Sequence, residues 1–483
     1  MTEHIVVIGG GITGLSAVEH LTRTDSRLRV TLLEASDRLG GNIRTDSTDG
    51  FVIEHGPDVL LAAKPAALEL AARVGLGDRV LPSARGAYVL GERGLVPLLE
   101  GITGLIPSRV WPFLTTTLLS PLGKLRVALE FFVPPRKADA DESIEHFVVR
   151  RLGREMYDRI AEPLLSGISA GDGRRLSLAA MFPQLRALER EHGGLMRGML
   201  AMRRSRTRHA GRARPEPSSP FVSFPGGLGE LTEAIVRTLR SRDPSEARIA
   251  LRKASAAVRL SRSPSGKGFT IDLAGGETVA ADALIVATPA YVAGELLHEV
   301  DRDLSMRLGE IEYGSSVTVS VAYPSSAVGR ALTGTGYVVP RIRKRPVLAC
   351  TWSSAKFPGR APEGYALFRV FLGGAGRGSY VSAEDAELRE IVANEMRDVM
   401  GIHVPPVLER ITRFDRAMTQ YHVGHLDRVA AIQAAASRIP FLYLAGAAYG
   451  GVGIPDCIRS AERAAASAAR DVAERSKSPA AIS

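Results

Sequence analysis

The sequence has very little cysteine, and this limits the kind of protein that it can encode. Only Cys350 and Cys457 occur among 483 residues. Two cysteines so far apart form neither a disulfide framework nor a CxxC metal pair, so we expect no metal and a reducing, cytoplasmic location. No stretch of about 20 uncharged apolar residues occurs, which argues against a transmembrane helix. A strand pattern begins at His4, so no signal peptide is expected.

Acidic residues are also fewer than basic residues. The 52 Asp and Glu residues stand against 62 Lys and Arg residues, which gives a formal net charge of +10. A basic chain can bind nucleic acid, an anionic membrane surface or an anionic small molecule. No zinc-finger, RNP-type or helix-turn-helix pattern is present, so we expect no nucleic-acid partner. The overall composition is typical of globular proteins, and the length predicts two or three domains.

Residues 4–21 carry a nucleotide-binding pattern, HIVVIGGGITGLSAVEHL. Gly9, Gly11 and Gly14 have GxGxxG spacing after a short apolar strand and before a helix, and a second strand ends at Glu34. In such a unit the glycine turn and the helix N-terminus face a pyrophosphate, and the acid accepts hydrogen bonds from ribose. The predicted contacts are Gly9, Gly10, Gly11, Ile12, Thr13, Gly14, Glu34 and Ala35.

The following residues favour FAD over NAD. The segment EASDRLGGNIRT resembles the extended fingerprint of FAD enzymes in the flavin amine-oxidase superfamily, and GFVIEHGPDVL resembles the superfamily segment that approaches the flavin. In the same superfamily, the segment that brings the chain back to the FAD domain carries a valine close to the adenine in its first strands. Val258 is the matching position. The resemblance adds Arg38, Gly40, Gly41, Arg44, Gly56, Pro57, Asp58, Val59 and Val258 to the expected FAD contacts.

A second glycine-rich turn lies near the end of the chain, in LYLAGAAYGGVGIPDCIRSAERAAASAA. It is typical of a strand, a turn and a helix, and we interpret it as the other wall of the same FAD site. The positive end of its helix would then stabilise negative charge on the reduced flavin ring. The expected contacts are Gly446, Val452, Gly453 and Ile454.

The middle of the chain predicts further parts. Residues 81–135 are rich in Leu, Pro and aromatics, which favours a helical roof over an apolar pocket; the alternative is a patch that enters one membrane leaflet, with Arg109, Lys124 and Arg126 meeting phosphates. The arginine-rich stretch 203–220 is either a solvated mobile loop or an electrostatic lure for an anion. Three segments between 247 and 290 read as a β-meander, and a mixed sheet with a helix at 383–400 follows.

These patterns predict an α/β fold: a discontinuous Rossmann-like FAD-binding domain, a mixed-sheet substrate domain and a helical subdomain. The expected ranges are 1–80, 215–290 and 426–475 for FAD binding, 81–214 for the helical substrate or membrane-contact subdomain, 291–425 for the substrate domain, and 476–483 for a flexible tail.

Several motifs in the same order resemble the protoporphyrinogen and coproporphyrinogen oxidases, including FPGGLGEL, QYHVGH and AGAAYGGVGIPDCIRSAERAA. The PDCI form is similar to bacterial coproporphyrinogen III oxidases, because eukaryote-like members typically have Asn at the position of Pro455. The resemblance implies a six-electron oxidation of a porphyrinogen by FAD, dioxygen as acceptor, release of hydrogen peroxide and a downstream ferrochelatase. Contact with the inner face of a membrane is compatible with it, and the oligomeric state is left open.

No residue pattern identifies a catalytic side chain. His55, His422 and His425 are possible bases, although lone histidines are more often structural. The alternatives are a protoporphyrinogen IX oxidase, an amine or polyamine oxidase, a carotenoid desaturase-like enzyme, and a non-enzymatic prenyl-protein escort. No SGGC-type segment is present, as monoamine oxidases commonly have, and the intact flavin motifs argue against the escort. Four propionates on coproporphyrinogen suit a basic protein better than two.

Overall fold

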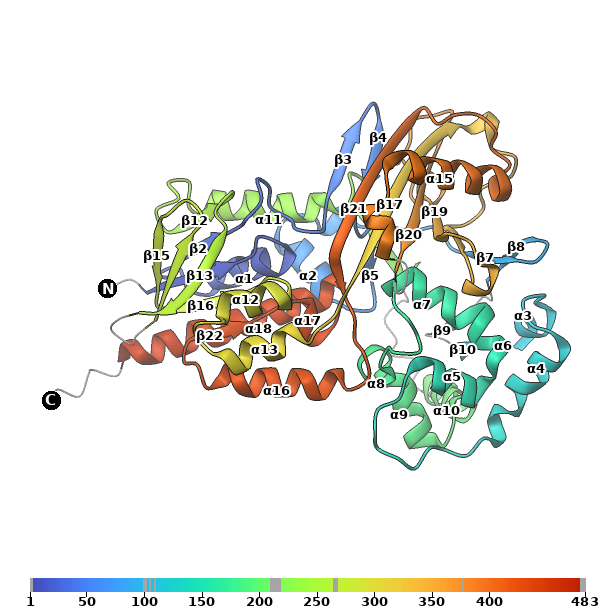
Figure 1. Cartoon of the computed structure of the whole chain (residues 1–483), viewed down its shortest axis with the longest axis horizontal. Coiled ribbons are helices and arrows are strands. Elements are labelled where there is room, and N and C mark those ends of the chain that lie inside the picture. The colour runs from blue at the N-terminus through green and yellow to red at the C-terminus, as the bar shows by residue number, and fades with distance from the viewer. Residues whose placement is uncertain are drawn as a thin grey trace.

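The computed structural model describes residues 3–98, 102–103, 106–107, 110–208, 219–263, 268–374 and 378–477. The chain forms three parts, shown in Figure 1: a parallel sheet covered by helices on the left, a second sheet at the upper right and a helical subdomain at the lower right.

The first part is a parallel sheet in the order β12-β2-β1-β16-β22. Its strands come from three separate stretches of the chain, so the predicted discontinuous α/β fold is confirmed. The bounds are β1 (His4–Ile8), β2 (Arg29–Leu33), β12 (Ile249–Arg252), β16 (Ala283–Val286) and β22 (Leu442–Leu444).

Both faces of this sheet are covered, which explains why all five residues of β1 are buried. Ile5 and Val7 pack on one side against α1 (Ile12–Thr24), α2 (Ala66–Arg73), α11 (Gly229–Arg242) and α18 (Ile454–Lys477). Val6 and Ile8 face the other side, where the covering elements are β13 (Ala257–Arg262), β14 (Phe269–Leu273), β15 (Thr278–Ala281), α12 (Ala290–Leu297), α13 (Arg302–Gly309) and α16 (His425–Ser437).

The predicted β-meander is smaller than expected. β12 joins the parallel sheet beside β2, with Ile249 opposite Val30, and only β13, β14 and β15 form an antiparallel meander. A short apolar strand has the same sequence pattern in either sheet, so the pattern alone does not distinguish them.

The second sheet has the order β21-β17-β20-β19-β18-β7-β8. Its central strands belong to the predicted mixed substrate domain, and α15 (Asp385–Met400) covers it through Leu388, Val392 and Met396. The bounds are β7 (Tyr88–Gly91), β8 (Gly94–Pro97), β17 (Tyr313–Pro324), β18 (Gly336–Val338), β19 (Val347–Trp352), β20 (Tyr365–Gly373) and β21 (Leu408–Thr419).

β7 and β8 correct the prediction that residues 81–135 form a helical roof throughout. They make a hairpin in which Leu90 lies opposite Leu95, and β7 extends the second sheet by pairing in parallel with β18. The glycines that flank the short turn at 91 and 94 are the hairpin signal in the sequence. The apolar composition of the segment hid this signal.

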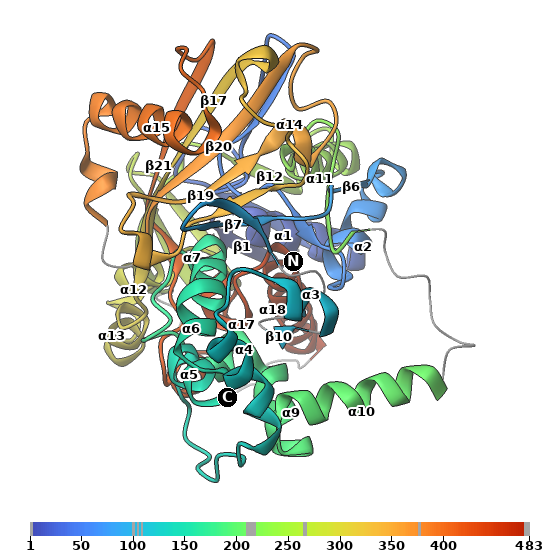
Figure 2. The ribbon, with the colours of Figure 1, turned by 90° about the vertical axis from the view of Figure 1, so that its right-hand side faces the viewer.

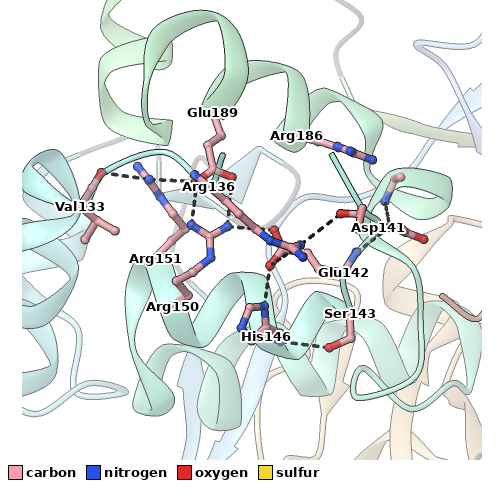
Figure 3. Close-up of polar contacts among 12 residues, drawn as sticks. Val133, Arg136, Asp141, Glu142, Ser143, His146, Arg150, Arg151, Arg186 and Glu189 are labelled. Carbon is pink, nitrogen blue, oxygen red and sulfur yellow. Dashed lines mark hydrogen bonds and ion pairs between the residues drawn. The ribbon is translucent and has the colours of Figure 1, made fainter. Parts of the chain in front are cut away.

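The helical subdomain follows, and α10 extends away from it in Figure 2. It consists of α3 (Val110–Thr115), α4 (Pro121–Ala128), η2 (Leu129–Phe132), α5 (Ile144–Leu152), α6 (Arg154–Met156), the π-helical turn η3 (Tyr157–Ala161), α7 (Glu162–Ser169), α8 (Leu178–Met181), α9 (Pro183–His192) and α10 (Leu195–Arg208). A fully buried arginine, Arg151, holds it together. Its Nε donates to Glu130 Oε1 at 2.8 Å, and its Nη1 donates to Glu189 at 3.1 Å, as Figure 3 shows for Glu189.

Some predictions fall partly outside the described residues. Within the arginine-rich stretch, residues 203–208 end α10, whereas 209–218 are not described. The predicted tail is not described beyond residue 477, and the domain boundaries stay predictions. Among the described residues, no helix combines the length and the apolar character needed to cross a membrane.

Candidate functional site

The turn after β1 is built around glycine. Gly9 has a φ of +107°, and a Cβ on Gly14 would lie 1.8 Å from the carbonyl oxygen of Gly9. Only glycine therefore lets α1 begin so close to β1. The Gly10 N–H donates to Glu34 Oε2 at 2.6 Å, so the acid that follows β2 lies against the turn, and Ala35 follows it at the surface.

The N-terminus of α1 is open toward a ligand. Among the described residues, no side chain caps it, so its first amides and the positive end of the helix dipole can face an anion. The nearest atom to a Cβ built on Gly11 would be Gly41 Cα, at 3.8 Å. This space and these donors fit the pyrophosphate of FAD, with Ile12 and Thr13 in the first turn and Glu34 placed for the ribose.

Residues 38–44 fold back onto this turn. The Gly40 N–H donates to the Gly10 carbonyl at 2.8 Å, and Arg38 donates to the carbonyls of Gly41 and Ile43. Burial lowers the pKa of Arg38. Through its hydrogen bonds to the two carbonyls, the Arg38 guanidinium holds the loop in shape. Arg44, in contrast, is exposed and pairs with Asp46 at 3.3 Å.

The terminal glycine turn lies at the same edge of the sheet. Gly446 follows β22, which pairs with β16 beside β1, and the nearest atom to a Cβ on Gly446 would be Thr13 Oγ1, at 3.8 Å. The two glycine turns therefore border one region, with α1 and α18 packed side by side. Gly453 accepts from the Asp456 N–H at 2.9 Å at the start of α18, and Val452 and Ile454 flank it half-buried.

A buried charge cluster lies where the flavin-binding part meets the second sheet. Asp58 Oδ2 is 2.7 Å from Lys356 Nζ and 3.2 Å from Arg369 Nη2. Lys356 ends α14 (Ser353–Lys356), and Arg369 belongs to β20. Nearby, Arg360 donates to Ser223 Oγ and to the Phe224 carbonyl, both at 3.0 Å. Its guanidinium also lies 3.8 Å from Glu54. We name Glu54, Asp58, Lys356, Arg360 and Arg369 the junction cluster.

Asp58 of the junction cluster makes stability depend on pH. Burial alone would raise the pKa of Asp58, but the charges of Lys356 and Arg369 lower it to about 2. Because this is below the value of an unfolded aspartate, the ionised form stabilises the fold above about pH 4, and this stabilisation is lost as the pH falls toward 2.

The three cations of this cluster, Lys356, Arg360 and Arg369, were not predicted from the sequence. The signal was present in YALFRVFLG, where Arg369 interrupts an apolar strand, since a charge in a buried strand needs a partner. Gly56 and Pro57 precede Asp58, and a Cβ on Gly56 would lie 2.0 Å from the Asn42 carbonyl oxygen, so this segment lies against the 38–44 loop. Val59 follows, half-buried.

Other sequence-predicted residues lie apart or have structural partners. Val258 occupies a β-bulge and is 57% exposed, so its side chain faces away from the core, and its adenine contact stays a prediction. The ring nitrogens of His55 lie 2.7 Å from Asp46 and 2.5 Å from Thr412. His422 lies beside Glu312 at 3.4 Å. His425 is buried, and burial lowers its pKa to about 4, so none of the three is placed as an obvious base.

The family described as "Flavin containing amine oxidoreductase" matches residues 12–469. The chain belongs to this family. Members of this family contain flavin, which confirms the prediction of FAD as the cofactor. The structure has a site that fits FAD. Among curated relatives, the coproporphyrinogen III oxidase of Bacillus subtilis (strain 168) is 36% identical, over 96% of this chain and 98% of that protein.

Other relatives support the same placement. The coproporphyrinogen III oxidase of Propionibacterium freudenreichii subsp. freudenreichii is 36% identical over 96% of this chain and 90% of its own. The chloroplastic protoporphyrinogen oxidase of Oryza sativa subsp. japonica is 30% identical over 95% and 87%. A solved structure from Exiguobacterium sp. 255-15, named among the protoporphyrinogen oxidases, has a TM-score of 0.84 and 31% identity, covering 98% of this chain and 99% of that one. The predicted resemblance to the porphyrinogen oxidases is confirmed.

Substitution of Gly453 tests the terminal turn. Gly453→Asp places a second carboxylate where a Cβ would already be 3.1 Å from Asp456 Oδ2. We expect FAD binding to fall at least tenfold, because the added charge and bulk oppose an electron-rich ligand at the helix N-terminus. The measurement is a fluorescence titration of the apoprotein with FAD.

The control is Gly275→Asp, since a Cβ on Gly275 meets open space. If Gly453→Asp binds FAD as tightly as this control, the flavin does not lie at the N-terminus of α18.

Proposed function

We propose that this protein oxidises coproporphyrinogen III to coproporphyrin III in haem biosynthesis, with FAD as cofactor and dioxygen as acceptor. The observation that carries the proposal is the 36% identity with the coproporphyrinogen III oxidase of Bacillus subtilis over 96% of the chain. The terminal PDCI form and the basic composition support the tetracarboxylate as substrate. The product would pass to an iron-inserting enzyme of the ferrochelatase type, in the cytoplasm.

The reaction removes six electrons and six protons from the porphyrinogen in three two-electron steps. FAD held by the two glycine turns would supply the two-electron acceptor for each step, and dioxygen would take up the electron pairs and protons as hydrogen peroxide. The protein's own residues position and polarise this site. The N-terminus of α18 favours negative charge, and Lys356, Arg360 and Arg369 outnumber the two acids of the junction cluster.

Porphyrin fluorescence tests the substrate. Purified protein with FAD and oxygen should oxidise coproporphyrinogen III with a kcat/KM about tenfold above that for protoporphyrinogen IX, which is the effect of one well-placed charge-assisted contact. Hydrogen peroxide should appear in step with the porphyrin. A preference for protoporphyrinogen IX would assign the enzyme to the last oxidation before protohaem. Oxidation of neither, with turnover of an amine, would contradict the proposal.

We also propose that the helical subdomain contacts an anionic membrane surface. Large apolar side chains are exposed together on neighbouring elements: Leu114, Leu122, Leu125, Leu129, Phe131 and Phe132 on α3, α4 and η2, and Leu200 and Met202 on α10. Basic residues accompany them, since the Arg197 guanidinium lies 4.7 Å above the Phe131 ring and Arg204 is exposed. Arg126 instead donates inward to the carbonyls of Arg150 and Arg151, and Arg109 lies outside the described residues.

Two exposed side chains allow a direct test of this surface. Leu122 and Phe132 are 77% and 74% exposed, so Leu122→Asp with Phe132→Asp should leave the fold intact. Binding to vesicles that contain phosphatidylglycerol should fall at least tenfold, because two apolar side chains lose their burial in the bilayer. The control is Leu426→Asp on α16, where Leu426 is 52% exposed. Equal vesicle binding by all three proteins would contradict membrane contact.

A further inference from the structure

The segment 420–424, directly after β21, contacts all three parts of the molecule. The Gln420 N–H donates to the Glu312 carbonyl at 2.9 Å on the side of the second sheet. The Ser177 N–H of the helical subdomain donates to the Tyr421 carbonyl at 2.7 Å. The Gly424 N–H donates to Asp141 Oδ2 at 3.1 Å, and the same oxygen accepts from Ser177 Oγ at 2.6 Å. The backbone of this segment is therefore fixed from two sides.

Its one buried hydroxyl reaches the terminal glycine turn. Tyr421 Oη accepts from the Gly451 N–H at 2.8 Å and donates to the Ala447 carbonyl. These two groups lie at opposite ends of α17 (Ala447–Gly450). The hydroxyl therefore bridges the start and the end of the turn.

The turn needs such a bridge because glycines make it pliable. Gly446 and Gly451, on either side of α17, have φ values of +132° and +129°. Glycine both adopts and leaves such a backbone conformation at little energetic cost. A bond from each end of the turn to one fixed hydroxyl restricts it to a single conformation.

The ring of Tyr421 is itself held in place. It is 3% exposed and stacks on His425, with ring centroids 3.8 Å apart and planes 16° from parallel. Burial raises the pKa of Tyr421, so its hydroxyl keeps the proton that the Ala447 carbonyl accepts.

We propose that Tyr421 is a positioning residue for the flavin: its hydroxyl closes the 446–451 turn in the shape that receives the cofactor. The Tyr421 hydroxyl acts through the turn and touches no reacting atom. This inference rests on the placement of the flavin at the terminal turn, and it is independent of which porphyrinogen is oxidised.

Tyr421→Phe tests the proposal because it removes the hydroxyl and keeps the ring and the backbone ties. We expect the FAD dissociation constant of the apoprotein to rise about tenfold, which corresponds to ~1.4 kcal/mol, and the visible circular dichroism of the bound flavin to change. The matched control is Tyr443→Phe, which removes a hydroxyl that donates to Asp471 at 2.5 Å on the later part of α18. Tyr443→Phe should change neither quantity.

Two results would overturn the proposal. One is an FAD dissociation constant within twofold of the natural protein with an unchanged flavin spectrum in Tyr421→Phe. The other is an equal loss of affinity in both variants, which would indicate a general effect on stability. A second variant, His425→Ala, keeps the hydroxyl but removes the stacked ring, and should weaken FAD binding by a smaller factor, about threefold. If Gly453→Asp retains full FAD affinity, the placement of the flavin fails instead.

Discussion

The contact of Asp58 with Lys356 and Arg369 fixes how the flavin-binding part meets the second sheet. Charges removed from water are tolerated only when they are paired at good geometry, so this contact permits little sliding between the two parts. Arg360 extends the same constraint to Ser223 and Phe224, at the return of the chain to the flavin-binding part. Three separate stretches of chain therefore meet at one cluster, next to the 56–59 segment that is expected to approach the flavin.

The proposed flavin site lies between the junction cluster and the terminal glycine turn. The first glycine turn offers uncapped amides, the 38–44 loop closes over it, and the terminal turn completes the edge through Gly446 and the N-terminus of α18. The arrangement suits an enzyme in which the cofactor carries the electrons. The protein then needs to supply position and charge around the cofactor, and no triad, metal pair or carboxylate pair is required for the electron transfer.

The structural features that the sequence predicts best are local. Gly9, Gly14 and Glu34 are recognisable because their spacing reflects a turn of fixed geometry between one strand and one helix. The junction cluster was not predictable in this way, because Asp58 and Lys356 are 298 residues apart and no local pattern links them. The position of β12 beside β2 and the pairing of β7 with β18 were missed for a related reason, since such strand pairing is decided by tertiary partners.

The most direct test of the central claim is a double-mutant cycle on the junction cluster. Asp58→Asn, Lys356→Met and the double variant would be compared by urea unfolding of the apoprotein at pH 7 and by FAD affinity. Asp58→Asn leaves the buried Lys356 ammonium without its carboxylate and should lose about 3–5 kcal/mol. Lys356→Met leaves Asp58 paired with Arg369 alone and should lose less. The double variant should lose clearly less than the sum of the two single losses and recover part of the FAD affinity that Asp58→Asn loses. Losses that add to within about 0.5 kcal/mol, with FAD affinity unchanged in all three, would contradict the account.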